Sequence, residues 1–280
     1  SQTIPTLVPF LTRIYLIQGR LHACNGLSRE FLDSIQEKDM RFIYSAASMK
    51  IDLGEVLYEW NALDEAEVHI REGVEFNQVW RNIMTEGFGL VALTRLLLAK
   101  GEFAEAMLAV DKFENRMREH SQPREFHEDF HTLRVRVQLA EGDLESASRW
   151  ADQIQQSDIF NLHPERYQLS IARVRLEQKR YAEVEGLLSG FVPPIAAGSR
   201  ISRQLESNLM LAAALAGQQK LSDAMDWVET CLVLAEPEGY VRVFLDVGEP
   251  ARDLLNAYLR SDSTGHAEYA KKLLDAFPPD

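Results

Sequence analysis

Apolar residues recur along the chain at helical spacing, in runs separated by short turns. In the first run, Leu7, Leu11 and Ile14 lie on one face of a helix, at intervals of three and four residues. A turn at Gly19 then leads into a second run. Continued along the chain, the pattern predicts six pairs of helices, at residues 6–18 and 21–35, 41–59 and 64–80, 84–100 and 103–118, 124–141 and 145–155, 164–178 and 181–188, and 200–216 and 221–235.

The second helix of each pair begins at a recurring apolar anchor. In the clearest case Leu63 is followed three residues later, on the same helix face, by the smaller Ala66. Successive anchors are about forty residues apart, and a repeat of this length indicates an array of stacked helix pairs. The anchors begin at Leu21, Leu63, Phe103, Leu144, Tyr181 and Leu221.

Glycines mark two of the turns between paired helices. The stretch KGEFAEA at residues 100–106 and the stretch EGDLESA at residues 141–147 are near copies of each other. We expect Gly101 and Gly142 to adopt the left-handed conformation that often ends a helix, because a Cβ disfavours it.

Two segments depart from the repeat. Residues 189–199 contain two glycines and two prolines, which predicts a long loop within the array. After residue 239 the pattern changes to a short apolar segment at 240–245, a helix from 248 to about 260, and a last helix at 266–277. We interpret residues 240–280 as helices that cap the array, because a final repeat has no neighbour to cover its apolar face.

Composition narrows the function. The chain has 280 residues and a net charge of −13, and this acidity argues against nucleic-acid binding, which needs a basic face. Cys24 and Cys231 lie far apart without a CxxC motif, so we interpret them as reduced thiols of a cytoplasmic protein. No apolar run approaches the eighteen residues of a membrane-spanning helix. Motifs such as HExxH, GxSxG and GxGxxG are absent, so we expect neither an enzyme nor a bound cofactor.

Two stretches resemble a known family. The stretch AEPEGYVRVFLD at residues 235–246, followed by Gly248-Glu249-Pro250, resembles the end of the sensor region in large ATP-binding LuxR-type transcriptional regulators of the maltose-activator kind. Residues 53–80, which contain LYEWNAL, resemble the same region further upstream. In that family a nucleotide-binding module precedes the sensor region and a helix-turn-helix domain follows it. The chain has no GxxxxGK[ST] motif, so the resemblance implies ATP and DNA binding for a longer parent protein, not for these residues.

Together the repeats and the resemblance predict an all-α fold. We expect a right-handed superhelix of about six TPR-like helix pairs over residues 1–239, capped within the same domain by residues 240–280, which would lead into a linker to a DNA-binding domain. The implied function is the signal-sensing and protein-interaction region of a bacterial regulator, bound to a small-molecule inducer or protein effector and to other modules of the parent. The alternative is a free-standing helical-repeat scaffold that binds a peptide or helix.

Aligning the repeats by their anchors suggests a binding groove. Eight residues before three of the anchors stand Arg95, Arg136 and Arg173, and the equivalent position before Leu63 holds Glu55. In stacked repeats these positions would form a ladder along the concave surface, where arginine suits contact with carboxylate or phosphate groups. The alternative is that each arginine pairs with a nearby carboxylate and only keeps the groove soluble.

Other candidate groove residues lie on the predicted first helices. Tyr44, Tyr58 and Phe88 would face the same concave surface, although such aromatic residues also serve as core. His127 and His131 are four residues apart and would share a helix face, a spacing that can hold a metal ion. Because no third ligand is in register with them, we predict no metal site and include His131 as a groove residue.

Overall fold

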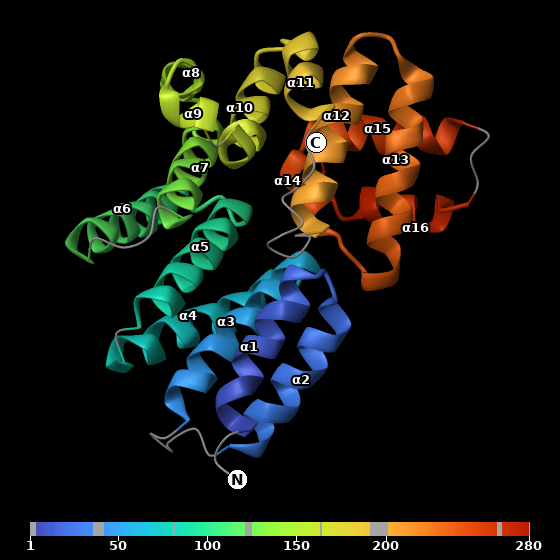
Figure 1. The fold of residues 1–280 in the computed structure, drawn as a ribbon. Helices are drawn as coiled ribbons and strands as arrows, with labels where there is room; N and C mark the ends of the chain where they lie inside the picture. Colours follow the sequence, from blue (N-terminus) through green and yellow to red (C-terminus); the bar gives the residue numbers. More distant parts are fainter. Residues whose placement is uncertain are drawn as a thin grey trace. The chain divides into compact units, whose positions relative to one another are not determined.

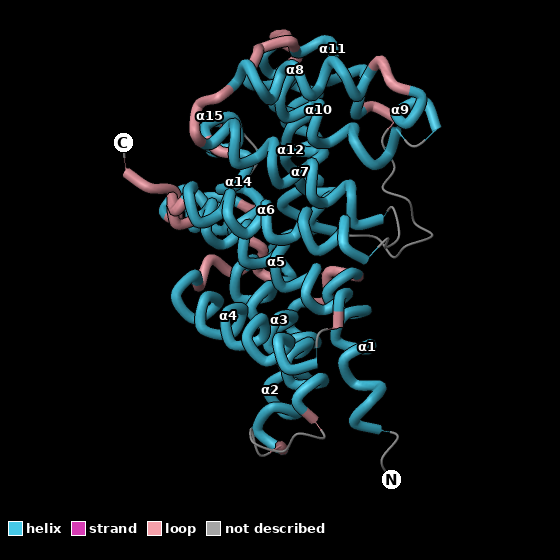
Figure 2. Tube along the Cα trace, turned by 90° about the vertical axis from the view of Figure 1, so that its left-hand side faces the viewer, coloured by secondary structure: helices cyan, strands magenta, loops and turns pink. Residues whose placement is uncertain are grey.

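The computed structural model describes residues 4–35, 42–80, 82–120, 125–162, 164–190, 201–261 and 265–279. Within these ranges the chain forms helices joined by short turns and loops, and no strand (Figures 1 and 2). The all-α prediction is therefore confirmed, whereas the right-handed superhelix stays a prediction. The chain divides into two compact units, Ser1–Asp143 and Leu144–Asp280, called unit 1 and unit 2 below.

The described part of unit 1 forms seven helices. These are α1 (Ile4–Ile17), α2 (Leu21–Ser34), α3 (Ile43–Glu59), α4 (Leu63–Trp80), α5 (Ile83–Ala99), α6 (Phe103–His120) and α7 (Glu125–Ala140). Each helix packs against the next along the chain, and α1, α3, α5 and α7, the first helices of successive pairs, also contact one another in that order. The first helices therefore form a continuous row, as stacked helix pairs require.

Glycines bring α3 and α4 close together. A Cβ on Gly54 in α3 would lie 2.4 Å from Cγ1 of Ile70 in α4. A Cβ on Gly73 in α4 would lie 2.7 Å from Cγ1 of Ile51 in α3. Both isoleucines are fully buried, so the two glycines leave the space that these side chains fill.

Unit 2 contains the remaining helices. These are α8 (Leu144–Gln155), α9 (Asp158–Leu162), α10 (Pro164–Glu177), α11 (Tyr181–Leu188), α12 (Ile201–Gly217), α13 (Leu221–Ala235), α14 (Arg242–Val247), α15 (Glu249–Arg260) and α16 (Ala267–Asp275), with a 3₁₀ turn at Glu236–Glu238. The expected long loop at 189–199 falls largely outside the described residues. The fourth predicted pair supplies α7 to unit 1 and α8 to unit 2.

One expected connector is a helix. Residues 157–163 lie between two of the predicted helix pairs, but a further helix, α9, forms there at Asp158–Leu162. The Ser157 hydroxyl accepts a hydrogen bond from the Phe160 backbone N–H at 3.3 Å, and Asp158 lies in the first turn. A capping serine and an early acidic residue both stabilise a helix N-terminus, which explains the short helix.

The segment after residue 239 packs on the last repeat pair. Both α14 and α15 contact α12, and α15 also contacts α13. Tyr240, Phe244 and Tyr258 are buried there, and the Tyr269 hydroxyl of α16 donates a hydrogen bond to the Tyr240 carbonyl. The predicted boundary at residue 239 lies inside unit 2 and stays a prediction.

The turns within the helix pairs share one backbone conformation. In each, the residue two positions before the anchor has a positive φ, so the prediction for Gly101 and Gly142 is confirmed. The conformation also occurs at residues that carry a Cβ. The six positions and their φ angles are Gly19 (72°), Asn61 (61°), Gly101 (76°), Gly142 (81°), Lys179 (58°) and Gln219 (66°).

Candidate ligand-binding site

Two of the predicted groove residues meet in unit 1. Arg95 in α5 lies over the ring of Tyr58 in α3, with 4.5 Å between the guanidinium carbon and the ring centroid. Arg95 also donates a hydrogen bond to Glu59 at 2.8 Å. Tyr58 and Glu59 are buried, so this arginine links two neighbouring first helices inside the unit.

Glu55 and Phe88 meet through a residue that the ladder did not include. Arg13 in α1 donates to Glu55 at 2.8 Å and lies 4.2 Å from the ring centroid of Phe88. The same guanidinium forms an ion pair with Asp52, which also accepts a hydrogen bond from the Thr12 hydroxyl at 2.8 Å. Burial raises the pKa of Asp52 to about 6, although the positive charge of Arg13 opposes this shift.

The other two arginines of the ladder lie on different units. Arg136 is partly buried on α7 in unit 1, and Arg173 is on α10 in unit 2. Arg173 donates to Glu206 at 2.6 Å and to the carbonyl of Asp246 at 2.8 Å. Arg95 and Arg173 thus each pair with a carboxylate, as the alternative to the ladder expected. The ladder as a ligand site stays a prediction.

Two further predicted residues are placed only as backbone. Tyr44 lies in α3 and His131 in α7, but their side chains are outside what the structure describes. The same holds for His127. Among the described residues, no group of three or more histidines, cysteines, aspartates or glutamates is arranged to hold a metal ion.

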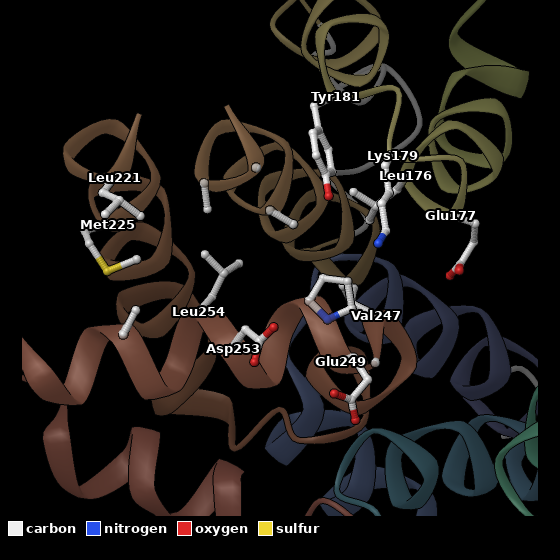
Figure 3. A pocket seen from close by; sticks show the side chains of 16 residues that line it. Leu176, Glu177, Lys179, Tyr181, Leu221, Met225, Val247, Glu249, Asp253 and Leu254 are labelled. Atoms are coloured by element: carbon white, nitrogen blue, oxygen red, sulfur yellow. The ribbon is translucent and has the colours of Figure 1, made fainter. Parts of the chain in front are cut away.

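A pocket of about 700 Å³ lies in unit 2 (Figure 3). Its walls come from α10 to α13 and from the junction of α14 with α15. A concave, mainly apolar space of this size is typical of sites for small molecules. The residues that line it are Leu176, Glu177, Lys179, Tyr181, Ala213, Ala216, Gly217, Leu221, Met225, Val247, Gly248, Glu249, Pro250, Asp253, Leu254 and Ala257.

Three local features of the sequence shape this pocket. The left-handed turn at Lys179 starts α11 at Tyr181, whose side chain extends into the pocket (Figure 3). Gly217 gives that ring its space, because a Cβ there would lie 2.5 Å from a ring carbon. Gly248, with φ at +81°, separates α14 from α15, and Pro250 lies in the first turn of α15.

The pocket has an apolar interior and a charged rim. Leu176, Val247 and Leu254 are buried and contribute only carbon to the walls. The charged side chains are all exposed, which keeps them hydrated in the absence of a ligand. They are Glu177, Lys179, Glu249 and Asp253.

The comparison with known families decides where this helical array belongs. The family model described as the MalT-like TPR region matches residues 1–261. The chain belongs to this family. The match extends through unit 1 and into unit 2 as far as the end of α15, so it includes every helix that lines the pocket and the helices that carry Arg95, Arg136 and Arg173.

Curated relatives of this MalT-like region carry the name HTH-type transcriptional regulator MalT. The protein from Yersinia enterocolitica is 26% identical over 247 residues, which are 85% of this chain and 26% of that protein. Those from Yersinia pestis and Yersinia pseudotuberculosis are 24% identical over 263 residues, or 92% of this chain and 28% of theirs. The chain therefore spans about a quarter of the length of the relatives it matches.

Sequence reasoning missed the pocket although it singled out some of its residues. Tyr181 and Leu221 were recognised as repeat anchors, and Gly248-Glu249-Pro250 as the start of a helix. None of these patterns shows that residues 176–181 and residues 247–257, which are more than sixty residues apart in the chain, meet around one cavity. The order of the segments along the chain was the one available signal. A C-terminal segment that packs on the last repeats must come close to the turns of those repeats.

No described helix is long and apolar enough to cross a membrane.

Both cysteines are free and buried, and burial raises the pKa of each thiol. A buried thiol with a raised pKa is a poor nucleophile.

Proposed function

We propose that this chain is the effector-binding, regulatory region of a bacterial LuxR/MalT-type transcriptional regulator and acts in the cytoplasm. Membership of the MalT-like TPR family and the names of the relatives support the regulatory role. The pocket of unit 2 is the single observation that supports ligand binding, and we assign the effector to it. The chain itself has no catalytic role in this proposal. Its partners are the effector and the other modules of a longer regulator.

Linkage between ligand and conformation is the proposed mechanism. The pocket walls come from two segments, residues 176–225 of the repeats and residues 247–257 of the segment that packs on them. A ligand that contacts both segments stabilises the arrangement in which they lie together. If the longer regulator uses a different arrangement at rest, the differential affinity of the ligand for the two arrangements sets the strength of the response.

A pocket-filling variant tests this assignment. Ala257→Leu adds carbon to the pocket wall, and Ala182→Leu adds the same atoms to an exposed position of α11 outside the pocket. A library of small molecules is screened against the 280-residue chain by thermal shift, since a ligand that binds the native state raises the melting temperature. Compounds that bind should lose their shift in Ala257→Leu and keep it in Ala182→Leu. Binding that persists in both variants would show that the effector does not bind in this pocket.

One observation favours the second candidate function, a scaffold that docks a peptide or helix. On α1, Leu7, Phe10 and Ile14 are each about half exposed or more, along one face of the helix. Exposed apolar stripes of this kind are typical of protein contact sites. Replacing Phe10 and Ile14 by Ser should abolish capture of a partner by the longer regulator without changing the response to pocket ligands. If pocket variants and α1 variants fail together, the two sites are not separate.

A further inference from the structure

The rim of the unit 2 pocket carries an excess of negative charge. Glu177, Glu249 and Asp253 oppose the single positive charge of Lys179, which gives the four side chains a net charge of −2. Glu249 lies 3.4 Å from Arg252, but Glu177 and Asp253 form no ion pair among the described residues. At least two carboxylates are therefore available to a ligand at the pocket mouth.

From this arrangement we propose that the pocket binds amphipathic organic cations. The apolar body of the ligand would occupy the space between Leu176, Val247 and Leu254, and its positive group would lie among the rim carboxylates. Tyr181 adds an aromatic ring whose face attracts a cation. This inference rests on the proposed function, because it names the chemical class of the effector for the same pocket.

Other ligand classes fit the lining less well. An anion would meet three carboxylates and one ammonium group at the rim. A polyhydroxylated ligand buried against the interior would leave hydroxyl groups facing leucine, valine and alanine side chains, and an unmet hydroxyl in apolar surroundings is costly. A ligand with a cationic head at the rim and an apolar body inside matches both the rim carboxylates and the apolar interior of the pocket.

Two probes of matched shape and opposite charge test the ligand class. Tetraphenylphosphonium and tetraphenylborate are nearly the same size and equally apolar, so a difference in binding reports charge. Each is titrated into the 280-residue chain by calorimetry at two salt concentrations. We expect the phosphonium ion to bind at least fivefold more tightly than the borate, with a preference that shrinks at high salt because screening weakens exposed charges.

Charge-neutralising variants show whether the rim causes this preference. Asp253→Asn with Glu177→Gln should weaken phosphonium binding about tenfold, since an exposed charge pair is worth up to about a factor of five. The matched control, Asp275→Asn with Glu268→Gln, removes two exposed carboxylates of α16 outside the pocket and should change the affinity less than about twofold. Equal weakening in both double variants would mean loose association with an acidic surface, and would overturn the inference.

The same titrations separate this inference from the proposed function. Borate binding that is tighter than phosphonium binding, and is lost in Ala257→Leu, overturns the cationic class but keeps the pocket as an effector site. Binding of neither probe also overturns the class, and the library screen with Ala257→Leu then decides the effector site independently. Phosphonium binding that Ala257→Leu leaves intact places the cation outside the pocket and overturns the inference as well.

Discussion

The guanidinium of Arg95 stacks on the ring of Tyr58 at 4.5 Å and reaches the neighbouring carboxylate of Glu59. These contacts join α5 to α3, which are first helices of adjacent repeat pairs. Arg173 does the same between α10 and α12 through Glu206. A position selected from the sequence as a candidate ligand contact therefore holds neighbouring repeats together.

Arg95→Ala should destabilise unit 1 by about 2–4 kcal/mol, because it leaves the Glu59 carboxylate buried without this partner. Arg29→Ala is the control, since Arg29 and its partner Glu65 are both nearly half exposed and such surface pairs contribute about 0–1 kcal/mol. Chemical denaturation of both variants measures the difference. Equal losses would show that Arg95 contributes no more than a surface pair.

Much of the fold could be predicted because the repeat is local. The spacing of the anchors and the turn residues requires only the contacts between helices that follow each other in sequence. Gly101 and Gly142 were predicted to be left-handed for this reason. The same conformation at Lys179 and Gln219 could not be predicted from residue type, because the fold imposes it on side chains that disfavour it.

Introducing a glycine at one of these turns and removing one from another should therefore change stability in opposite directions. Gln219→Gly should stabilise unit 2 by about 1 kcal/mol, because the residue then adopts a positive φ without strain. Gly101→Ala should destabilise unit 1 by about 1 kcal/mol. Beyond the two neighbouring residues in the chain, no atom lies within 4 Å of the added Cβ at Gly101, so backbone strain is the expected cost. Melting temperatures measure both changes, and two shifts of the same sign would contradict the shared turn.

Gly54→Ala should destabilise unit 1 by about 1–3 kcal/mol, because the new Cβ would overlap Ile70 and force the packed helices α3 and α4 apart. Gly26→Ala is the matched control. Gly26 also lies inside a helix, but apart from the adjacent backbone of that helix no atom comes within 4 Å of its added Cβ, so alanine should stabilise by roughly 0.5–1 kcal/mol. Thermal melting distinguishes the two, and a gain in both variants would mean that α3 and α4 are not closely packed at this point.

The candidate site was less predictable than the fold. The anchor alignment placed Arg95 and Glu55 at equivalent positions of neighbouring repeats. It could not show that the Glu55 carboxylate would pair with Arg13. The alignment treats each repeat as identical, whereas the carboxylates within reach of an arginine differ from repeat to repeat, and Arg13 pairs with both Asp52 and Glu55. The pocket depends on the approach of segments that are distant in the chain, since Leu176 and Val247 line the same cavity, and no periodic pattern records this approach.

The buried Asp52 should make the stability of unit 1 depend on pH. Its pKa is raised to about 6 in the folded chain, above the ordinary value near 3.8, chiefly because burial disfavours the charged carboxylate. The folded state then holds the proton more tightly than the unfolded state does. The free energy of unfolding should fall as pH rises from about 4 to about 6, and this contribution should be constant above that window.

Asp52→Asn isolates this effect, because asparagine keeps the shape of the side chain and cannot ionise. Between pH 4 and pH 7 the stability of the variant relative to the natural chain should rise by on the order of 2 kcal/mol. Asp33→Asn, at an exposed position of α2, controls for the loss of one negative charge. Urea denaturation across this pH range measures the difference in the free energy of unfolding between each variant and the natural chain. If the stability of Asp52→Asn relative to the natural chain falls between pH 4 and pH 7, the ion pair with Arg13 and the hydrogen bond from Thr12 outweigh burial. Asp52 then stabilises the fold as a carboxylate.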